Sequence, residues 1–459
     1  MNPNVHPEGM VLPNLGRAAL ADAWLLLDAA RTPGAPRGML AVGVKRSLTL
    51  DLPSADAFER IEQFVGAATG RCFGWVGYDQ LRADPMLDLP SQDQPKVPMP
   101  TAHWVEPAGV LSFQNAGPEA SWNWQVKPDD PVLAKEMVQA VIERPAAAVH
   151  RTAWNGRDIH QGTPSSLDHE AYLKAFGRVH RHIQRGDIYE LNLCRELRGD
   201  LPLAFDALRA FYALVSRTTA PYSAYIPFGG RRILSASPEC FLERSGERLV
   251  SRPIKGTAAR QSDPAADSAA AERLRTDVKE RAENVMITDL VRNDLSRVAQ
   301  PMSVEVDELC GIHSFANVHQ MVSTVSCSVR EDASWSDIMR ATFPMGSMTG
   351  APKLRAMEIT AEVEPVERGL YSGTIGWAEP DGRGGVGDFH LNVVIRTLIA
   401  DLVEGEWSAH VGGAITALAE AEAEWEETCL KAQALLEVLA EGVRDENPDA
   451  NVLESDAHG

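Results

Sequence analysis

Strand-like runs and amphipathic helices alternate irregularly from residue 168 to residue 440, and this order limits the folds open to the chain. The run 168–185 is the sharpest case, because large apolar side chains recur on one helical face and Gly186 follows them. A regular doubly wound sheet would need strict alternation, so the pattern predicts a mixed α/β (α+β) fold. The expected elements are a helix over 168–185, strands over 224–227 and 232–236, a helix from 263 to 297, strands over 389–400 and 407–416, and a helix over 417–440.

The N-terminal part of the chain has a different sequence pattern, with short β-like runs and some helical patches. It also contains a proline-rich stretch that predicts a surface loop. The string FGWVGYD, residues 73–79, predicts a strand that ends in a turn. A glycine- and proline-containing segment around 155–166 marks the expected boundary. We therefore predict an N-terminal region over 1–155, a catalytic region over 165–440 and a flexible acidic tail over 441–459.

The charge balance excludes some classes of partner. The chain has 44 Lys and Arg residues against 64 Asp and Glu residues, a formal net charge of −20. No basic stripe is present, which argues against a nucleic acid or a membrane as partner. An anionic substrate would need a local group of cations or a bound metal ion to overcome this charge.

The remaining composition points to the cytoplasm. The six cysteines show neither a C-x-x-C spacing nor the rhythm of a zinc finger, so reduced thiols are expected. The first residues lack the basic and apolar regions of a secretory signal. No run approaches the apolar length of a membrane-spanning helix.

Two Glu-x-x-Glu pairs are the first candidates for chemistry. Glu280 and Glu283 lie in the expected helix 263–297, and Glu424 and Glu427 lie in the expected helix 417–440. The i,i+3 spacing places both carboxylates of a pair on one helical face. Carboxylate oxygens from two helices would suit Mg²⁺. Solvated acidic faces are the alternative for either pair alone, because spacing cannot show that the helices meet.

The second candidate is a turn that carries a lysine, SRPIKGT over 251–257. Pro253 and Gly256 would set an extended approach and a tight turn, which exposes the Lys255 amine beside backbone amides. A nucleophilic lysine must be uncharged, so its pKa has to be lowered by burial or by a cationic neighbour. Arg252 or a metal ion could supply that charge. An ordinary turn with a surface lysine remains the alternative.

A glycine-rich segment, PMGSMTGAPK over 344–353, is the third candidate. It opens a helix with proline at the first position, and such a start presents free N–H groups to an anion. Plain helix capping explains it equally well. The string GRCFG at 70–74 is similar to a glutaminase nucleophile elbow, but the residues that should follow it are absent, so a buried strand is expected.

Taken together, these motifs resemble the chorismate-utilising enzymes, the family of anthranilate, aminodeoxychorismate, isochorismate and salicylate synthases. The resemblance covers residues 165–437, and nine or ten motifs occur in the family's order. They are GDIYELNL (186–193), SPECF (237–241), PIKGT (253–257), KERAENVMITDLVRNDLSR (279–297), VHQMVSTV (318–325), GSMTGAPK (346–353), YSGTIGW (371–377), NVVIRT (392–397), VGGAI (411–415) and EWEETCLKA (424–432). It implies a large two-sheet, β-sandwich-like core surrounded by helices, as in anthranilate synthase component I.

Within this family, lysine at position 255 is typical of aminodeoxychorismate synthase component I. The resemblance then implies that Lys255 attacks C2 of chorismate while the C4 hydroxyl leaves, and that ammonia displaces the lysine to give 4-amino-4-deoxychorismate for 4-aminobenzoate and folate. Glu239 matches the general acid, which needs a raised pKa. His319 matches a histidine near C4, although a structural role remains open. Ammonia would come from a separate glutaminase subunit.

The resemblance also implies the binding residues. Mg²⁺ would lie between Glu283 and Glu427, with Glu280 and Glu424 acting directly or through water. The two carboxylates of chorismate would be held by the Gly256 and Thr257 amides, Tyr371, Arg396, Gly412 and Gly413, of which Arg396 can bind bidentately. Lys431 would add positive charge beside the metal ion and Arg396, and Ala414 is also expected to bind the substrate. Some relatives carry a tryptophan pocket, to which Pro221, Tyr222 and Ser223 correspond.

Two features depart from the family pattern. Glu190 stands where amine-using members commonly have Gln, and we interpret it as a variant rather than a switch of reaction. The stretch 416–423 lacks a turn common in relatives, which affects the approach to Glu424. Two other functions stay open: anthranilate synthase component I, and a degenerate homologue that acts as a binding or regulatory subunit.

Overall fold

The computed structural model describes residues 23–28, 38–113, 125–128, 163–218, 220–315 and 317–442. The expected boundary at 155–162 and all but the first two residues of the expected acidic tail lie outside these ranges. Within them, no helix combines the length and the apolar character needed to cross a membrane.

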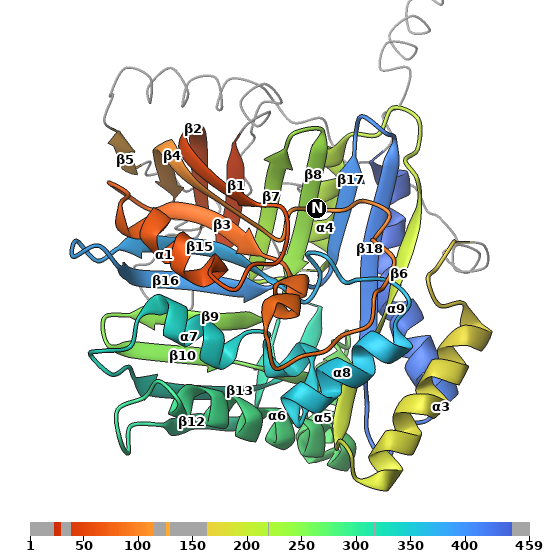
Figure 1. Cartoon of the computed structure of the whole chain (residues 1–459). Helices are drawn as coiled ribbons and strands as arrows, with labels where there is room; N and C mark the ends of the chain where they lie inside the picture. The colour runs from red at the N-terminus through yellow and green to blue at the C-terminus, as the bar shows by residue number, and fades with distance from the viewer. Residues whose placement is uncertain are drawn as a thin grey trace, which may run out of the picture.

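The strands pair into one large, continuous antiparallel sheet that bends into two groups (Figure 1). The neighbours in the first group are β6 (Glu190–Asp200), β18 (Glu406–Ile415), β17 (Thr397–Asp401), β8 (Arg231–Ser237), β7 (Tyr222–Phe228) and β1 (Trp24–Asp28). Those in the second are β3 (Cys72–Val76), β15 (Thr374–Pro380), β16 (Val386–Val393), β9 (Cys240–Ser245), β10 (Arg248–Arg252) and β13 (Val318–Ser328), with β11 (Ile254–Ala259) and β12 (Glu305–Ser314) also on β13.

The two groups are joined by long strands from the N-terminal region. β2 (Gly38–Leu50) pairs with β1 at one end and with β4 (Ala102–Phe113) along its length, and β4 in turn pairs with β3 and with β5 (Gln125–Pro128). β1 and β3 pair with β7 and β15 of the catalytic region. Hydrogen-bonded pairing therefore crosses the division that we expected between the two regions.

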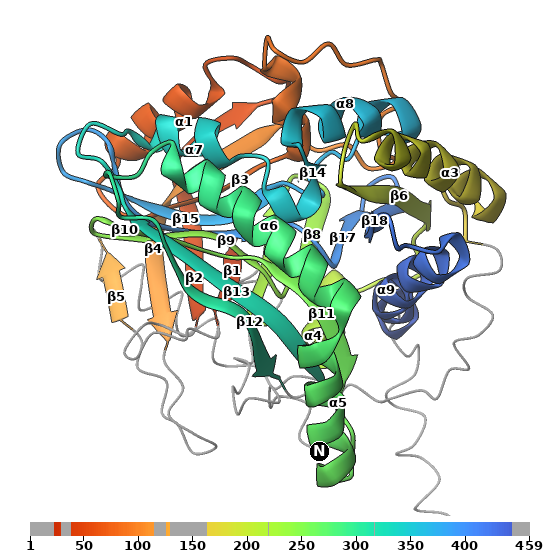
Figure 2. The ribbon, with the colours of Figure 1, turned by 90° about the horizontal axis from the view of Figure 1, so that it is seen from below.

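Helices cover the outer faces of the bent sheet. They are α1 (Ala57–Gly66), α3 (His169–Arg185), α4 (Ala207–Thr218), α5 (Pro264–Thr276), α6 (Val278–Ser296), α7 (Trp335–Thr342), α8 (Lys353–Val363) and α9 (Ala421–Glu441). α4 and α9 pack against each other and against the first group of strands through buried leucines and Phe211. α6 crosses the face of β11 and β13, and α9 packs on β18 (Figure 2).

The strongest helix prediction is confirmed. The Asp168 side chain accepts a hydrogen bond from the Ala171 N–H at the start of α3, and Gly186 ends the helix in the left-handed conformation at φ +80°. The strands expected over 224–227, 232–236 and 407–416 are also present, as β7, β8 and β18. The residues that mark the beginning and end of these elements lie next to them in the sequence, so the elements could be predicted locally.

Three boundaries were predicted wrongly. The expected helix 263–297 is two helices, because Asp277 leaves helical geometry and its side chain caps α6 by accepting from the Glu280 N–H. The expected strand 389–400 is interrupted between β16 and β17, where Arg396 has φ +51°. Helix α9 begins at Ala421, several residues after the start expected from its alanine-rich composition.

Candidate active site

Lys255 lies near the start of β11, and the tight turn expected at 251–257 is instead strand that pairs irregularly with β13. The register against β13 shifts between Ile254 and Thr257, and Gly256 has φ +89°. A side chain at Gly256 would meet the Glu280 carboxylate, since its Cβ would lie 3.0 Å from Glu280 Oε2. The bulge therefore brings the lysine and the adjacent backbone against α6.

The Lys255 amine points into the protein. Its side chain is only 10% exposed, and Nζ lies 2.6 Å from Oε1 of Glu190, which is 1% exposed. The alternative of a surface lysine is therefore excluded. Burial alone would lower the pKa of Lys255, but the charges of Glu190 and Glu283 raise it well above its usual value. The expectation of a lowered pKa is wrong for the protein without ligands.

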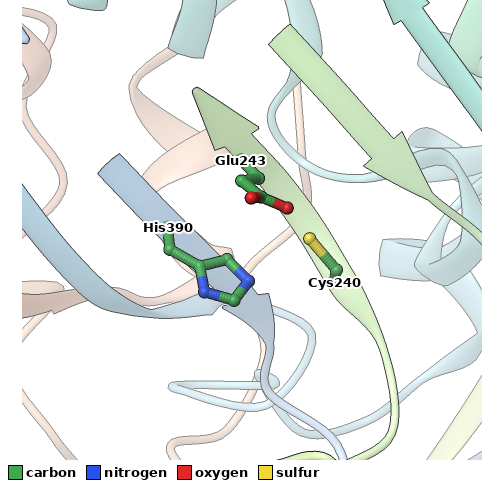
Figure 3. A group of neighbouring side chains, drawn as sticks. All are labelled: Cys240, Glu243 and His390. Carbon is green, nitrogen blue, oxygen red and sulfur yellow. The ribbon is translucent and has the colours of Figure 1, made fainter. Parts of the chain in front are cut away.

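Arg252 does not act on Lys255 as expected, because its side chain is used elsewhere. Its Nη1 lies 2.6 Å from Glu243 Oε2 and 3.7 Å from Cys240 Sγ. Figure 3 shows Cys240 and Glu243 on β9 beside His390 on β16. These three side chains have the residue types of a metal site, but the guanidinium of Arg252 already supplies a positive charge there.

Glu239 lies in the two-residue connection between β8 and β9 and is 5% exposed. The Ser347 hydroxyl donates to its Oε1 over 2.5 Å, and its own N–H donates to the Ser237 hydroxyl. Burial raises the pKa of Glu239 to about 7, against the opposing effects of Ser347 and Lys255. The raised pKa expected for a general acid is therefore confirmed.

The acidic pairs of α6 and α9 do meet. Lys279 Nζ lies 2.8 Å from Glu424 Oε1 on α9 and 4.0 Å from Glu283 Oε1 on its own helix. Burial and mutual repulsion raise the pKa of Glu280 and of Glu424, and that of Glu283 rises to about 7. Burial would also raise the pKa of Glu427, but Lys431, 2.6 Å away, lowers it below its usual value.

The same carboxylates fit a divalent cation. Glu283 Oε1 and Glu424 Oε2 are buried and accept no hydrogen bond from any residue that the structure describes. A Cβ on Gly413 would lie 3.1 Å from Glu424 Oε2 and 4.0 Å from Glu427 Oε1, so the glycine leaves room beside these oxygens. Buried anionic oxygens without donors form the kind of hard-oxygen site that Mg²⁺ prefers.

Several of the predicted substrate-binding residues lie around this cluster. Lys431 Nζ donates to the Gly412 carbonyl over 2.9 Å. A Cβ on Gly412 would lie 2.6 Å from Cys194 Sγ, because β18 and β6 are closely apposed there. Ala414 follows on β18, opposite Asn192, and Thr257 is exposed beside Gly256. Of these residues, Lys431 lies beside the acidic cluster through its contact with Glu427.

Tyr371 and Arg396 were predicted to hold carboxylates. Tyr371 is 7% exposed and stacks on His410 at 5.4 Å between ring centroids. Arg396 forms no ion pair with any carboxylate in the described part of the chain, and burial lowers its pKa. A shielded guanidinium without a counter-ion favours binding of an anion. Its role in chorismate binding stays a prediction.

His319 has a structural environment. Its Nδ1 lies 2.8 Å from the Ser314 hydroxyl and its Nε2 lies 3.0 Å from Asp267 Oδ1, so both ring nitrogens are engaged. Asp267 also pairs with Arg260. This arrangement supports the structural role that the sequence left open, and a catalytic role near C4 stays a prediction.

The residues of the possible tryptophan pocket are buried in the sheet. Tyr222 and Ser223 lie on β7 between β1 and β8, and the Tyr222 ring meets His390 edge-on at 5.0 Å. The Ser223 hydroxyl has no hydrogen-bond partner among the described residues. Pro221 precedes this strand and is also buried. Binding of tryptophan here stays a prediction.

Three residues of the site escaped sequence reasoning. Glu190 was interpreted as a variant rather than a switch of reaction, and its ion pair with Lys255 was not foreseen. Ser347 lies within a recognised motif, but nothing local relates it to Glu239. Lys279 precedes the first acidic pair and reaches the second one. For Glu190 the sequence did offer a signal, since this acid begins the apolar run ELNL and is therefore expected to be buried. A buried charge needs a partner of opposite charge, which would have pointed to a nearby lysine or arginine.

Comparison with known proteins agrees with this geometry. The model of a family described as chorismate binding enzyme matches residues 36–437. The chain is 43% identical over 274 residues to the aminodeoxychorismate synthase of Streptomyces griseus, covering 59% of this chain and 36% of that protein. It is 40% identical over 275 residues to aminodeoxychorismate synthase component 1 of Escherichia coli (strain K12), covering 60% and 59%. The matched segments thus span less than two thirds of either relative.

A solved structure confirms the predicted fold class. The anthranilate synthase component I of Streptococcus pneumoniae TIGR4 superimposes with a TM-score of 0.72, covering 89% of this chain and 93% of that one. The sequence identity is 21%, so this likeness concerns the fold alone. The fold of this chain is mixed, with a large antiparallel sheet and surrounding helices.

Proposed function

The chain belongs to the family of chorismate binding enzymes, and from this premise we propose that it is the synthase subunit of an aminodeoxychorismate synthase. It converts chorismate and ammonia to 4-amino-4-deoxychorismate through a covalent adduct on Lys255, and the product leads to 4-aminobenzoate and folate. The observation that carries this proposal is the position of the Lys255 amine. It is buried with Glu190 and within the field of Glu239 and Glu283.

Each residue of the site has a task in this reaction. The amine of Lys255 forms a bond to C2 of the ring as the bond from C4 to its hydroxyl breaks. Glu239 donates the proton that lets the hydroxyl leave as water, and its raised pKa keeps that proton available near neutral pH. Ammonia then bonds to C4 and the lysine leaves C2, so the enzyme is regenerated.

Binding and orientation of chorismate fall to the surrounding groups. Glu280, Glu283, Glu424 and Glu427 would hold Mg²⁺, and a bound Mg²⁺ would supply positive charge that stabilises negative charge on the substrate. Arg396 binds a substrate carboxylate, and the absence of a side chain at Gly413 leaves room for the substrate beside Glu424 and Glu427 of α9. This local positive charge outweighs the net charge of −20.

Ammonia comes from a separate glutaminase subunit in this proposal. The name of the Escherichia coli relative, component 1, implies a partner component for that protein. The GRCFG segment that is similar to a glutaminase elbow is no candidate here, because Cys72 lies in β3 with 0% exposure and burial raises the pKa of its thiol to about 12.

Mass spectrometry of the intact protein tests the covalent step. Chorismate and Mg²⁺ without ammonia should add a dehydrated chorismate to the wild-type mass, and peptide mapping should locate it on Lys255. Lys255→Ala should show no adduct, and Lys96→Ala, which removes a surface lysine paired with Glu406, should react like wild type. An adduct that persists in Lys255→Ala would refute the proposal, and anthranilate fluorescence with ammonium salt would identify the rival activity.

The metal assignment has its own test. Glu427→Gln should raise the Mg²⁺ concentration for half-maximal activity by at least about tenfold, because one anionic oxygen is lost from the cluster. Glu426→Gln is the matched control, since that side chain is the exposed neighbour on α9. Equal Mg²⁺ titrations for the two variants would contradict the assignment.

A further inference from the structure

Glu190 is held rigidly at the point where Lys255 enters the site. It begins β6 and pairs with Ala351 of β14, the two-residue strand Gly350–Ala351 that belongs to the glycine-rich segment. A Cβ on Gly350 would lie 2.1 Å from the Glu190 carbonyl oxygen, so only glycine lets the two backbones approach this closely. Backbone pairing thus fixes the position of residue 190, from which the carboxylate reaches Lys255.

The contact between the two side chains is short and exclusive. Glu190 Oε1 lies 2.6 Å from Lys255 Nζ, and no other carboxylate of the described residues is within ion-pair distance of that nitrogen. The second oxygen of Glu190, Oε2, is buried and has no hydrogen-bond partner in the described part of the chain. Among the described residues, the Lys255 amine is therefore the only hydrogen-bond donor to the Glu190 carboxylate.

Lys255 is one half of a buried ion pair, because its Nζ lies 2.6 Å from the Glu190 carboxylate, and further acids face it. Burial would lower its pKa, but the carboxylates around it raise the value well above the usual one. Those acids come from four segments, namely Glu190 of β6, Glu239 of the β8–β9 connection, Glu280 and Glu283 of α6, and Glu427 of α9. An ammonium has no lone pair, so it cannot attack carbon until a proton leaves it.

We propose that Glu190 is a further catalytic residue, the base that takes this proton from Lys255. The inference rests on the proposed function. In the step, a proton moves from Nζ to Oε1, which converts the ion pair into a neutral amine beside a neutral carboxylic acid. The nitrogen lone pair then forms the bond to C2, the ring double bonds shift, and the bond from C4 to oxygen breaks. The hydroxyl leaves as water with the proton of Glu239.

This assignment has a consequence for pH dependence. The ion pair and the neutral pair contain the same number of protons, so the fraction of reactive amine does not change with pH while the pair persists. With Gln at position 190, the proton must instead be lost to solvent, and the reactive fraction then rises about tenfold per pH unit below the pKa of the lysine. Titration of Glu239 affects the rates of wild type and of Glu190→Gln in the same way, so it cancels in the ratio of the two rates.

The experiment measures the rate of adduct formation by intact mass in the full-length chain, with chorismate and Mg²⁺ at pH values from about 6 to 8. The ratio of wild-type to Glu190→Gln rates should fall about tenfold for each pH unit. Glu190→Asp keeps a carboxylate, so its ratio to wild type should stay constant with pH even if its rate is lower. Glu196→Gln is the matched control on the same strand, because that buried acid contacts Lys96 and Arg198 instead.

The outcomes separate this inference from the proposed function. A wild-type to Glu190→Gln ratio that is constant with pH, with adduct present in both, would overturn the role of Glu190 and leave the lysine mechanism standing. An absence of adduct in wild type at every pH would overturn both. A wild-type to Glu190→Asp ratio that also falls as the pH rises would count against Glu190 as the proton acceptor, because Glu190→Asp retains a carboxylate.

Discussion

The raised pKa of Glu239 predicts a specific pH dependence of stability. This carboxyl is 5% exposed, and burial raises its pKa to about 7 from an ordinary value of 4.5. Its folded-state pKa therefore exceeds its unfolded-state pKa. Between these two values the folded protein holds a proton that the unfolded chain has lost. The free energy of unfolding should consequently fall as the pH rises from 4.5 to about 7.

The size of this effect follows from the two pKa values. One pKa unit corresponds to about 1.4 kcal/mol, so ionising Glu239 in the folded protein costs about 3 kcal/mol in total. The stabilising contribution is fully present below pH 4.5 and is lost above about pH 7. Glu239→Gln is neutral at every pH and should lack this loss. Glu283, whose pKa also rises to about 7, contributes to both proteins alike.

Urea denaturation at a series of pH values, with a chelator present, measures the difference. The wild-type free energy of unfolding should fall between pH 4.5 and 8 by about 3 kcal/mol more than that of Glu239→Gln. Glu106→Gln is the control of opposite sign, because Arg46 and Thr69 overcome burial and lower the pKa of Glu106 to about 2. Its contribution changes only below pH 4.5. Parallel wild-type and Glu239→Gln curves would refute the reasoning.

Three further outcomes are expected. Gly413→Ala should weaken Mg²⁺-dependent turnover, because its Cβ would lie 3.1 Å from Glu424 Oε2, and a Mg²⁺ titration like that of wild type would contradict the crowding. Ser347→Ala removes a hydrogen-bond donor that favours the ionised form of Glu239, so the pKa of Glu239 should rise. The alkaline limb of the pH–rate profile should then move up by about one pH unit. An alkaline limb at the wild-type position would show that this hydrogen bond does not affect the pKa of Glu239. Asp168→Ala should cost about 1 kcal/mol of stability by removing the cap of α3, measured by urea denaturation, with kcat unchanged.

Local elements could be predicted where their signals lie within a few residues. Helix α3 has its capping aspartate, its apolar face and its terminal glycine within one segment, so its bounds were predicted correctly. The break at Asp277 could have been found from the same kind of signal, because an aspartate precedes a glutamate three residues later. The break at Arg396 carries no such signal, since a non-glycine residue with positive φ is stabilised by tertiary contacts.

The sequence by itself determined the identity of the chemical groups and their spacing: a lysine on a glycine turn, acids three residues apart on helices, and the order of the family's motifs. Only the tertiary structure decided which groups share a site and in which charge state. Strand pairing and helix packing bring Glu190 and Glu239 against Lys255, and they bring Lys279 against Glu424. Electrostatic interactions depend on distance through space rather than on separation along the chain. The sequence therefore suggested that Arg252, three residues away, would lower the pKa of Lys255, whereas the acids that distant segments bring around the amine raise it.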